Sequence, residues 1–351
     1  MKKILVFTDA FSGGGAEEVM SIFSNELVRN FDVIHVSKWL GPKEKVLKSN
    51  MINLKKTSSK LCLPDLYKIS KKFRPDFIFT STSHNNILIL ILKYLLPFNV
   101  KVVVRVSSVA SVIKDYSWKN RLINFYLLKN LYKYAHKIIA QSADISSDLI
   151  DYYKIPKEKI KIINNPIYKG EIIQNELRDN TIWLLTIGRF SKEKGHERLI
   201  EVMTKLPNNY KLRIMGDGIL KNKIETLVKD KKIYDKVEFL GFLDESEKLK
   251  IINKSNLYIQ TSFVEGFPNS LLQAVSLGLP AIAFDVPGGT KEIINEGNGC
   301  LIEDGNLEAM AKKIQETPFE QFNAEKMQSD IIGRFGVQKV MSNLKTVFND
   351  S

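Results

Sequence analysis

Apolar residues gather into short runs rich in β-branched and aromatic side chains, and stretches of helical character separate these runs. In the first half they are Ile4–Phe7, Val33–Val36, Phe77–Thr80, Val100–Val106 and Lys137–Ala140. In the second half they are Trp183–Ile187, Lys211–Met215, Val237–Leu240, Leu257–Gln260 and Ala281–Phe284. Runs that are apolar almost throughout indicate parallel strands covered by helices on both faces. The pattern therefore predicts an α/β protein with two doubly wound parallel sheets.

The alternation is interrupted at residues 160–166, where asparagine and proline appear, and a new strand begins after Asp179. A chain of 351 residues also exceeds the usual size of a single core. We therefore expect a first domain over residues 1–165 and a second over residues 166–335. An amphipathic helix within residues 336–351 is expected to pack back toward the first domain.

The remaining composition excludes several classes of protein. The basic and apolar start resembles a signal peptide, but Asp9 ends the apolar run, so a buried first strand is expected. The longest apolar run, residues 87–98, contains Lys93 and falls short of the roughly 20 residues that cross a bilayer. Cys62 and Cys300 have no ligand-like spacing, so neither a disulfide framework nor a zinc site is predicted, and a reducing compartment fits.

Positive charge is concentrated in the first half. Residues 1–165 hold 27 Lys and Arg against 13 Asp and Glu, whereas residues 166–351 hold 25 against 26. This asymmetry indicates an anionic partner such as a phospholipid surface, a polyphosphate-linked substrate or a nucleic acid; a lysine-rich solvated surface is the alternative. The basic, aromatic stretch 114–133 fits a membrane interface, or an ordinary helix packed on the first sheet.

Two strand-to-helix turns carry features of phosphate sites. Gly13, Gly14 and Gly15 follow the first strand, where a backbone without Cβ atoms can approach a ligand, although a purely structural turn fits equally well. In the second half Gly188 and Arg189 follow a strand, and Lys194 precedes a helix. A guanidinium and an ammonium at a helix N-terminus are suited to bind a diphosphate.

The segment Glu265-Gly-Phe-Pro-Asn-Ser-Leu-Leu-Gln273-Ala lies between a strand and a helix that Pro268 and Asn269 are expected to start. The free backbone N–H groups of such a helix would face a phosphate. Glu265 offers two oxygens to the vicinal hydroxyls of a sugar, although an isolated loop acid can also be ordinary.

These motifs together resemble the retaining glycosyltransferases of family 4, which have the GT-B fold. The resemblance rests on residues 188–195 and 265–274, with Pro280, Gly288 and Gly289 beyond them, and it covers essentially the whole chain. It also includes the glycine loop at residues 13–15, Asn165-Pro166 at the domain junction, and Gly216-Asp-Gly218.

The resemblance implies roles for individual residues. Arg189 and Lys194 would bind the diphosphate and stabilise its departing charge, and Glu265 would contact the transferred sugar, these three being the catalytic set. Backbone donors would come from Gly266 to Ser270. The predicted nucleotide-sugar site comprises Gly14, Gly15, Gly188, Gly216, Gly266, Phe267, Pro268, Asn269, Ser270 and Gln273.

Two positions depart from the family pattern. The second acid of the family's E-x7-E motif, which usually holds the ribose, is Gln273 here, and an amide can still pair with a diol. The family often has a histidine after the strand Val100–Val106, where this chain has Arg105 and Ser107. These could bind an anionic acceptor or an acidic donor sugar, and a structural strand end is equally compatible. None of the four histidines has ligand-like spacing, so none is expected to be catalytic.

The resemblance implies a retaining hexosyltransferase with an acceptor-binding first domain, a nucleotide-sugar-binding second domain and a site in the cleft between them. A UDP-sugar would be the donor substrate, with no cofactor. No Asp-x-Asp pair occurs, so metal-independent activity is expected. The acceptor would be a polyprenyl-diphosphate-linked or lipopolysaccharide-type glycan at the cytoplasmic membrane face. A UDP-sugar epimerase and an inactive sugar-nucleotide-binding homologue remain alternatives. No nucleic-acid-binding motif is found.

Overall fold

The computed structural model describes residues 1–41, 47–112, 126–172 and 180–349. The chain divides into two structural units. Unit 1 comprises Met1–Pro166 and Val337–Ser351, and unit 2 comprises Ile167–Gly336. The division therefore falls one residue after the predicted junction, and the end of the chain returns to unit 1.

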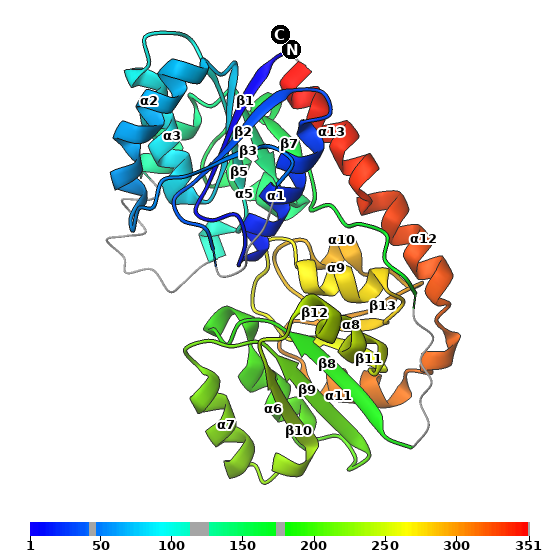
Figure 1. Ribbon diagram of the computed structural model, residues 1–351. Coiled ribbons are helices and arrows are strands. Elements are labelled where there is room, and N and C mark those ends of the chain that lie inside the picture. Colours follow the sequence, from blue (N-terminus) through cyan, green and yellow to red (C-terminus); the bar gives the residue numbers. More distant parts are fainter. Residues whose placement is uncertain (42–46, 113–125, 173–179, 350–351) are drawn as a thin grey trace. The chain divides into compact units, whose positions relative to one another are not determined.

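Unit 1 is built on a parallel sheet of seven described strands in the order β3-β2-β1-β4-β5-β6-β7 (Figure 1). Strands β1, β4 and β5 at its centre are almost wholly buried, as expected for a sheet covered on both faces. The strands are β1 (Lys3–Thr8), β2 (Asp32–Ser37), β3 (Asn50–Asn53), β4 (Phe77–Ser81), β5 (Lys101–Val106), β6 (Lys137–Ala140) and β7 (Ile160–Ile162).

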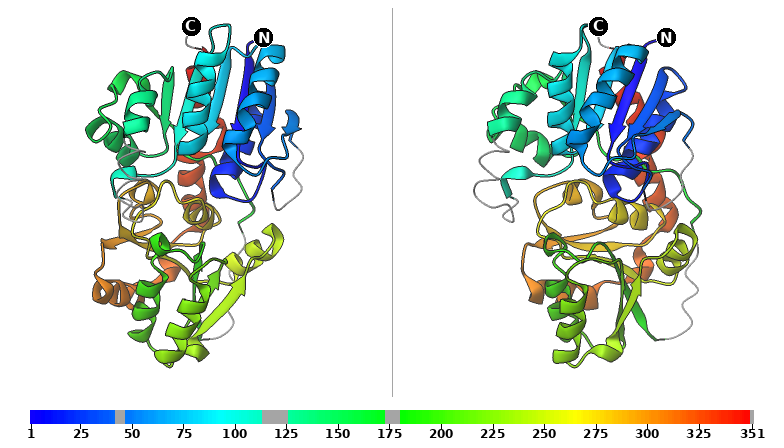
Figure 2. Two further views of the ribbon diagram at one scale, coloured as in Figure 1. Left: turned by 90° about the vertical axis from the view of Figure 1, so that its left-hand side faces the viewer. Right: turned by 60° about the vertical axis from the view of Figure 1, so that its left-hand side comes forward.

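Unit 2 repeats this plan with six described strands in the order β10-β9-β8-β11-β12-β13, again all parallel. Figure 2 shows helices on both faces of each sheet. The strands are β8 (Ile182–Ile187), β9 (Tyr210–Met215), β10 (Val237–Gly241), β11 (Leu257–Gln260), β12 (Ala281–Asp285) and β13 (Gly299–Glu303).

The ten predicted strands are confirmed, and the α/β class with two doubly wound sheets is confirmed with them. Three further strands, β3, β7 and β13, were not predicted. Each lies at an edge of its sheet and is partly exposed, so its sequence lacks the continuous apolar run that marks a central strand. Residues 160–162, which the sequence suggested as part of the junction, form edge strand β7.

Helices connect successive strands, and further helices follow the last strand. Those of unit 1 are α1 (Gly15–Leu27), α2 (Leu63–Phe73), α3 (Ser83–Leu95), α5 (Ala143–Asp151) and α13 (Val337–Asn349), and residues 126–132 are also helical. Those of unit 2 are α6 (His196–Thr204), α7 (Lys221–Asp230), α8 (Glu245–Asn253), α9 (Asn269–Ser276), α10 (Thr290–Ile293), α11 (Leu307–Glu316) and α12 (Ala324–Phe335). Short 3-10 turns are η1 (Ser59–Cys62), η2 (Ala110–Val112), η3 (Lys157–Lys159), η4 (Lys192–Lys194), η5 (Tyr234–Lys236) and η6 (Phe319–Gln321).

The final helix, α13, completes the core of unit 1. Its ring of Phe348 is fully buried and meets the rings of Phe77 and Phe79 edge-on, with centroids 5.3 and 5.6 Å apart. Two buried aromatic pairs of this kind stabilise the contact beyond simple area burial. The predicted amphipathic helix at residues 336–348 thus corresponds to α13, which packs against α1 in the same core.

Both sheets change direction at their middle. In unit 1 the connections run outward from β1 on one side and β4 on the other, and in unit 2 they run outward from β8 and β11. Doubly wound sheets bind ligands at the carboxyl ends of the two strands that flank such a reversal. No described helix is long and apolar enough to span a bilayer.

Candidate functional site

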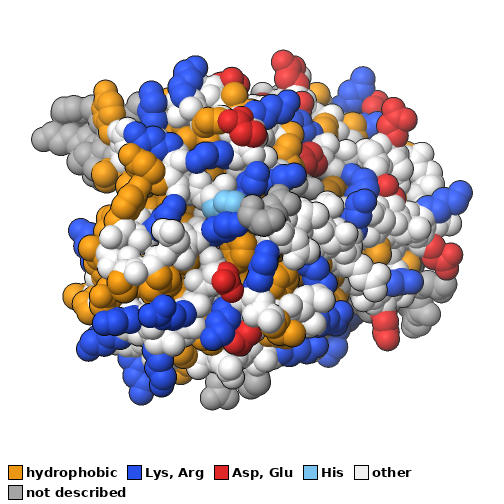
Figure 3. All heavy atoms as spheres, turned by 90° about the horizontal axis from the view of Figure 1, so that it is seen from above, with side chains coloured by type: hydrophobic (Ala, Val, Ile, Leu, Met, Phe, Trp, Pro, Cys, Tyr) orange, Lys and Arg blue, Asp and Glu red, His pale blue; other side chains and the backbone are white. Residues whose placement is uncertain are grey.

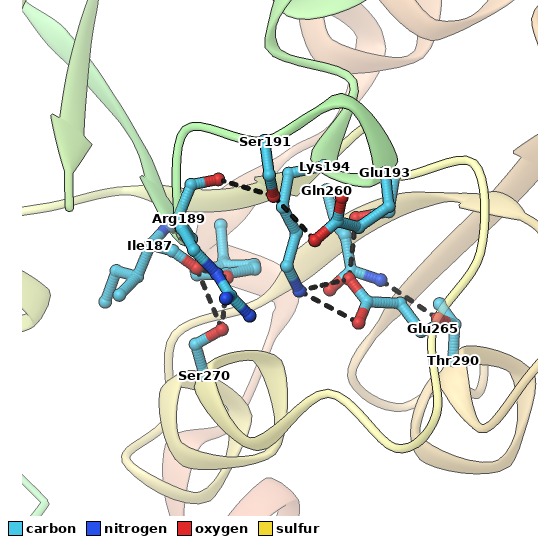
Figure 4. Close-up of polar contacts among 11 residues, drawn as sticks. Ile187, Arg189, Ser191, Glu193, Lys194, Gln260, Glu265, Ser270 and Thr290 are labelled. Carbon is cyan, nitrogen blue, oxygen red and sulfur yellow. Dashed lines mark hydrogen bonds and ion pairs between the residues drawn. The ribbon is translucent and has the colours of Figure 1, made fainter. Parts of the chain in front are cut away.

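The carboxyl ends of β8 and β11 bring together two of the predicted catalytic residues. After β8 the chain passes through Gly188 and Arg189 to η4, which ends at Lys194. The Lys194 side chain returns over Gly188, and its Nζ donates to Oε1 and Oε2 of Glu265 at 2.8 and 2.9 Å (Figure 4). The side chain of Glu265 is 8% exposed and that of Lys194 is 23% exposed. A largely buried ion pair therefore lies at the reversal point of the unit 2 sheet.

Several close backbone approaches hold this ion pair in place. Gly195, which precedes α6, has a φ of 63°, and a Cβ there would collide with the carbonyl of Thr261 after β11. Gly288 has a φ of 124°, and a Cβ there would collide with the carbonyl of Glu265. Only glycine meets both demands without strain. The two glycines therefore let the Lys194 loop and the Glu265 loop approach their neighbours.

Hydrogen bonds within and next to its own loop also hold Glu265 in position. Ser262 Oγ donates to Glu265 Oε1 at 2.6 Å, and the Glu265 backbone N–H donates to the Pro287 carbonyl at 3.0 Å. A carboxylate with a lysine and a serine as donors is oriented, and its remaining lone pairs can accept from hydroxyl groups of a ligand.

Arg189 is exposed at the same edge. Among the described residues its guanidinium has no hydrogen-bond or ion-pair partner, and Figure 4 shows the side chain extending above Ser270. Below it, Ser270 Oγ donates to the Ile187 carbonyl at 2.9 Å and accepts from Tyr258 Oη at 3.0 Å. Burial raises the pKa of Tyr258, which stays protonated as a donor. The guanidinium is therefore available to an anion, while the polar groups beneath it are engaged.

The first turn of α9 supplies backbone donors at this site. Asn269 and Ser270 begin the helix, as predicted, and N–H groups of a first turn have no intrahelical acceptor. Pro268, which was included among the backbone donors, has no N–H group. The Phe267 ring is buried and packs edge-on against Phe335, so the ring is not available to a ligand. The Gly266 carbonyl accepts from the Gly289 N–H.

The side-chain amide of Gln273 is hydrogen-bonded to an acid from a neighbouring helix. Its Nε2 donates to Oε1 of Glu245 at 2.5 Å, and the other carboxylate oxygen of Glu245 contacts Lys248 Nζ at 2.6 Å. Glu245 is the first residue of α8, a helix capped by Asp244. A carboxylate from another helix thus accompanies the amide that replaces the second acid of the motif. Sequence reasoning missed Glu245, since only the fold brings α8 to α9.

The ion pair borders a small pocket, which His196 lines together with Lys194, Tyr258 and Glu265. Burial, with the positive charge of Lys194 adding to it, lowers the pKa of His196 to about 4. The imidazole is stacked on Phe190 with ring centroids 4.6 Å apart. It is therefore neutral at physiological pH and contributes shape rather than charge.

The other predicted glycines lie in both units. Gly216 follows β9 and approaches the backbone of Gly188 so closely that any Cβ would collide with its carbonyl. Gly14 and Gly15 start α1 in unit 1, so they come from a different unit than the Lys194–Glu265 pair.

Arg105 is fully buried at the end of β5. Its guanidinium donates to Ser81 Oγ at 3.3 Å and to Asn165 Oδ1, and the Gln141 amide in its alternative orientation accepts from it as well. These bonds tie the ends of β4, β5 and β6 to residue 165. The geometry favours the strand-end alternative over direct contact with an acceptor. The neighbouring Ser107 is partly exposed.

The described residues contain no group of three or more His, Cys, Asp or Glu side chains suited to hold a metal ion. Comparison with known families then identifies the chain. A model described as Glycosyltransferase Family 4 matches residues 13–168, and one described as Glycosyl transferases group 1 matches residues 169–329. The chain belongs to these glycosyltransferases. The predicted family and enzyme class are confirmed.

Relatives of this glycosyltransferase act in bacterial glycan assembly, according to their names. One is the N-acetylgalactosamine-N,N'-diacetylbacillosaminyl-diphospho-undecaprenol 4-alpha-N-acetylgalactosaminyltransferase of Campylobacter jejuni, 27% identical over 340 residues and covering 90% of each chain. Another is the O-antigen biosynthesis glycosyltransferase WclY of Escherichia coli, 26% identical over 247 residues and covering 67% of each chain.

Solved structures share the whole fold. Anabaena Alr3699/HepE in complex with UDP matches with a TM-score of 0.82 at 18% identity, covering 100% of both chains. The lipopolysaccharide outer core galactosyltransferase WaaB in its apo form matches with a TM-score of 0.75 at 18% identity, covering 99% of both chains. These likenesses confirm the predicted GT-B fold.

Proposed function

We propose that this enzyme transfers a hexose, N-acetylhexosamine or uronic-acid-type sugar from a UDP-sugar to a polyprenyl-diphosphate-linked or lipopolysaccharide-type glycan. Transfer retains the anomeric configuration and needs no metal ion. One observation carries the proposal: Lys194 and Glu265 meet beside Arg189 and the first turn of α9. Cations suit a diphosphate and an oriented carboxylate suits sugar hydroxyls, so this set matches both ends of the donor.

The diphosphate of the donor is held by Arg189, Lys194 and the backbone N–H groups of α9. As the bond between the anomeric carbon and the phosphate oxygen breaks, negative charge grows on that oxygen. Fixed cations and helix-end donors stabilise this charge because they are already oriented toward it. They supply the neutralisation that a divalent cation gives in other transferases, which supports activity without metal.

Glu265 binds a hydroxyl group rather than attacking the sugar. Its carboxylate is restrained by Lys194 and Ser262, so it is suited to hold the transferred sugar in one orientation. The acceptor hydroxyl then attacks the anomeric carbon from the face that UDP leaves. The new carbon–oxygen bond forms as the old one breaks, and the departing phosphate oxygen takes the hydroxyl proton. The configuration is thereby retained without a covalent enzyme intermediate.

UDP and a lipid-linked acceptor are supported by the relatives. Anabaena Alr3699/HepE was solved with UDP, and the name of the C. jejuni relative describes an alpha transfer to a diphospho-undecaprenol-linked sugar. We extend both properties to this chain as proposals. Such an acceptor lies at a membrane surface, so we propose that the enzyme is a peripheral protein at the cytoplasmic face of the membrane.

Unit 1 carries a surface suited to that location, here named the aromatic–lysine patch. Two segments form it, because Lys93 Nζ donates to the Tyr134 carbonyl at 2.9 Å and the rings of Tyr94 and Tyr134 lie 5.4 Å apart. The exposed apolar members are Ile91, Tyr94, Leu95, Tyr126, Leu127 and Tyr134, and the basic members are Lys93, Lys129 and Lys133. On the face that Figure 3 presents, Lys and Arg side chains are spread among hydrophobic ones.

Aromatic side chains and lysines of this kind meet the headgroup region of anionic lipid. We therefore include an anionic membrane surface among the partners. Residues 114–125 of the basic, aromatic stretch lie outside the described residues, and residues 126–133 belong to the patch.

The deciding experiment is a panel of UDP- and GDP-sugars incubated with the purified enzyme, with and without EDTA. We expect slow hydrolysis of one UDP-sugar to UDP and free sugar of unchanged anomeric configuration, equal in EDTA. Conversion of a UDP-N-acetylhexosamine to its epimer without release of UDP would instead identify the epimerase. Binding of UDP without turnover of any donor would identify the inactive homologue.

A further inference from the structure

Arg198, in the first turn of α6, lies outside the motifs described above and contacts the loop that leads to Glu265. Its guanidinium carbon lies over the Phe263 ring, 3.4 Å from the ring centroid. Phe263 belongs to the segment between the end of β11 and Glu265. At this distance the guanidinium is in van der Waals contact with the ring face, an arrangement that arginine favours through its planar, delocalised cation. The contact therefore joins α6 to the Glu265 loop.

The guanidinium of Arg198 is itself anchored. Its Nη1 donates to Oδ1 of Asp304, the residue after β13, at 2.6 Å. A second ring, that of Phe284 in β12, lies 5.3 Å from the guanidinium carbon and is fully buried. The side chain of Arg198 is only 17% exposed. Arg198 is therefore fixed to the far strands of the sheet, and the loop is the part that it holds.

Two backbone contacts attach the same loop to the turn that carries Lys194. The Phe263 N–H donates to the carbonyl of Glu193 at 2.8 Å, and Thr261 Oγ1 donates to the carbonyl of Gly195 at 3.0 Å. These acceptors are the residues immediately before and after Lys194. The chain on both sides of Lys194 is thus bonded to the loop that leads to its ion-pair partner.

The loop needs such contacts because regular structure does not hold it. Residues 261–265 belong to no helix or strand, and the Phe263 ring is 44% exposed. A ring with this exposure is not fixed by burial in the core, and segments with few buried contacts open locally at low free-energy cost. The guanidinium that covers one face of the ring supplies a contact against this opening.

The position of the loop decides the geometry of the site. Lys194 Nζ reaches both carboxylate oxygens of Glu265, at 2.8 and 2.9 Å, only when the turn and the loop keep their present separation. A displacement of about 1 Å in a group that orients a substrate can cost a large factor in rate, up to about a hundredfold. A contact that limits movement of the loop therefore acts on turnover.

We propose that Arg198 is a positioning residue of the transfer reaction: it holds the Phe263 loop against the Lys194 turn and thereby fixes Glu265 for the transferred sugar. The inference rests on the proposed function, which gives Glu265 this task. Arg198 acts through Phe263 rather than by contact with the substrate, so its loss affects turnover more than UDP binding, for which Arg189 and the start of α9 remain.

The test uses Arg198→Lys, Phe263→Leu and the double variant. Lysine keeps the positive charge but lacks the planar group that covers the ring, and leucine keeps an apolar side chain without the ring. Both changes remove the same contact, so the double variant should lose no more than the more impaired single variant. Phe263→Tyr keeps the ring and should retain the wild-type behaviour.

Arg213→Lys is the matched control. Arg213 lies over the Trp183 ring at 3.7 Å and donates to Glu238 at 3.1 Å, and these partners belong to β8 and β10 rather than to either loop. This variant loses a stack of the same kind in the same unit. It should lower Tm about as much as Arg198→Lys does, with normal turnover.

Turnover, UDP affinity and amide hydrogen exchange are the readouts. With the UDP-sugar that the wild type hydrolyses, kcat should fall about tenfold in Arg198→Lys and in Phe263→Leu. UDP affinity measured by calorimetry should change by less than about twofold, the pattern of a loss confined to the transition state. Exchange in peptides that contain residues 261–265 should rise about three- to thirtyfold, the range of one cation–π contact.

Normal kcat with normal exchange in both single variants overturns the inference. So does additive loss in the double variant, or a fall in kcat that Arg213→Lys shows equally, since the stack would then serve only the stability of unit 2. A wild type that hydrolyses no UDP-sugar refutes the proposed function instead. The exchange of residues 261–265 still decides whether Arg198 holds the loop, because that measurement needs no turnover.

Discussion

The carboxyl ends of β1 and β4 in unit 1 and of β8 and β11 in unit 2 are equivalent places in two sheets that share the order of their first six strands. Their chemistry differs. In unit 2 an exposed Arg189 and the Lys194–Glu265 pair accompany the start of α9, whereas in unit 1 Asp9, Glu17 and His84 surround the starts of α1 and α3. In unit 2 the exposed cation has no partner among the described residues, whereas in unit 1 Asp9 is paired with both His84 and Lys38.

Two sheet edges of the same topology thus differ in chemistry through a few residues that follow the strands. In unit 2 no side-chain hydrogen bond caps the start of α9, and in unit 1 Glu17 lies over Gly14 at the start of α1. Substitutions that change the charge at each edge test this difference.

The largest effect is expected at the anion-binding edge. Arg189→Ala or Lys194→Ala removes one fixed charge that stabilises the departing diphosphate, so turnover should fall on the order of a hundredfold or more. Donor hydrolysis measures this, with Lys223→Ala, a surface lysine paired with Glu197, as the control. Near-normal turnover in both variants would show that Arg189 and Lys194 do not stabilise the departing diphosphate.

A second prediction concerns the basic surface of unit 1. Lys129→Ala combined with Lys133→Ala removes two charges from the aromatic–lysine patch, and each is worth about 1 kcal/mol near an anionic surface. Cosedimentation with phosphatidylglycerol vesicles should weaken by roughly tenfold or more, and salt should weaken the wild type similarly. Lys229→Ala with Lys231→Ala on unit 2 serves as the control. Binding that does not depend on lipid charge would contradict a role of the patch in membrane binding.

Acid sensitivity is the third prediction, and it concerns Asp9 at the unit 1 edge. Because the pKa of Asp9 in the folded state is about 2, below its usual 3.8, Asp9 stabilises the fold above about pH 4 and loses this effect as the pH falls through 2. Asp9→Asn should cost on the order of 1–2 kcal/mol at pH 7 and nothing below pH 2, after allowance for solvent screening.

Urea unfolding between pH 7 and pH 2 measures this difference. Asp235→Asn, whose carboxylate is 58% exposed and lies 3.7 Å from Lys211, is the comparison. A constant gap between wild type and Asp9→Asn across this range would contradict the assignment.

The fourth prediction tests the amide–carboxylate pair of unit 2. Gln273→Glu restores the acid of the family motif but sets it against Glu245, and two like charges at such a distance cost about 1 kcal/mol or more. UDP affinity measured by calorimetry should fall roughly fivefold, and Glu245→Gln in the same chain should restore it.

The matched control is Glu247→Gln in the same helix turn, since Glu247 bonds to Asp244 rather than to Gln273. Affinity for 2'-deoxy-UDP shows whether the Gln273–Glu245 pair contacts the 2'-hydroxyl of the ribose. Tighter UDP binding by Gln273→Glu alone would show that Glu245 does not share the site.

The smallest effect is expected at Thr82. Thr82→Gly relieves the strained backbone, which has a φ of 73° at this residue, and after the entropy cost of glycine it should stabilise unit 1 by about 0.5–1 kcal/mol. A rise in Tm of a few degrees is the readout. Thr82→Ala keeps the strain and removes the hydroxyl, so it should give no such rise. A lower Tm for the glycine variant would show that the conformation is not strained.

Much of the fold follows from local pattern. Central strands such as β1, β4 and β11 are buried on both faces, so their apolar runs identify them without any knowledge of their neighbours. Edge strands β3, β7 and β13 escape this signal because half of each strand meets solvent.

The sites follow from sequence only in part. Lys194 and Glu265 were identified separately as a phosphate cation and a sugar-binding acid, but nothing in the sequence indicated that their side chains meet. Arg105 could have faced an acceptor, and its complete burial became visible only in the packed sheet. His84 was not expected to be catalytic because the histidines lack ligand-like spacing, and its contact with Asp9, 75 residues away in the chain, became visible only in the structure.

Local pattern along the chain specifies the two parallel sheets, the helices between them, the uneven charge of the two halves and the motifs of the family. These depend on the periodicity and composition of neighbouring residues. Only the tertiary structure decided which side chains pair: Lys194 with Glu265, Gln273 with Glu245, and Asp9 with His84. The reason is physical, since hydrogen bonds and ion pairs act over a few ångströms in space, whatever the number of residues between the partners.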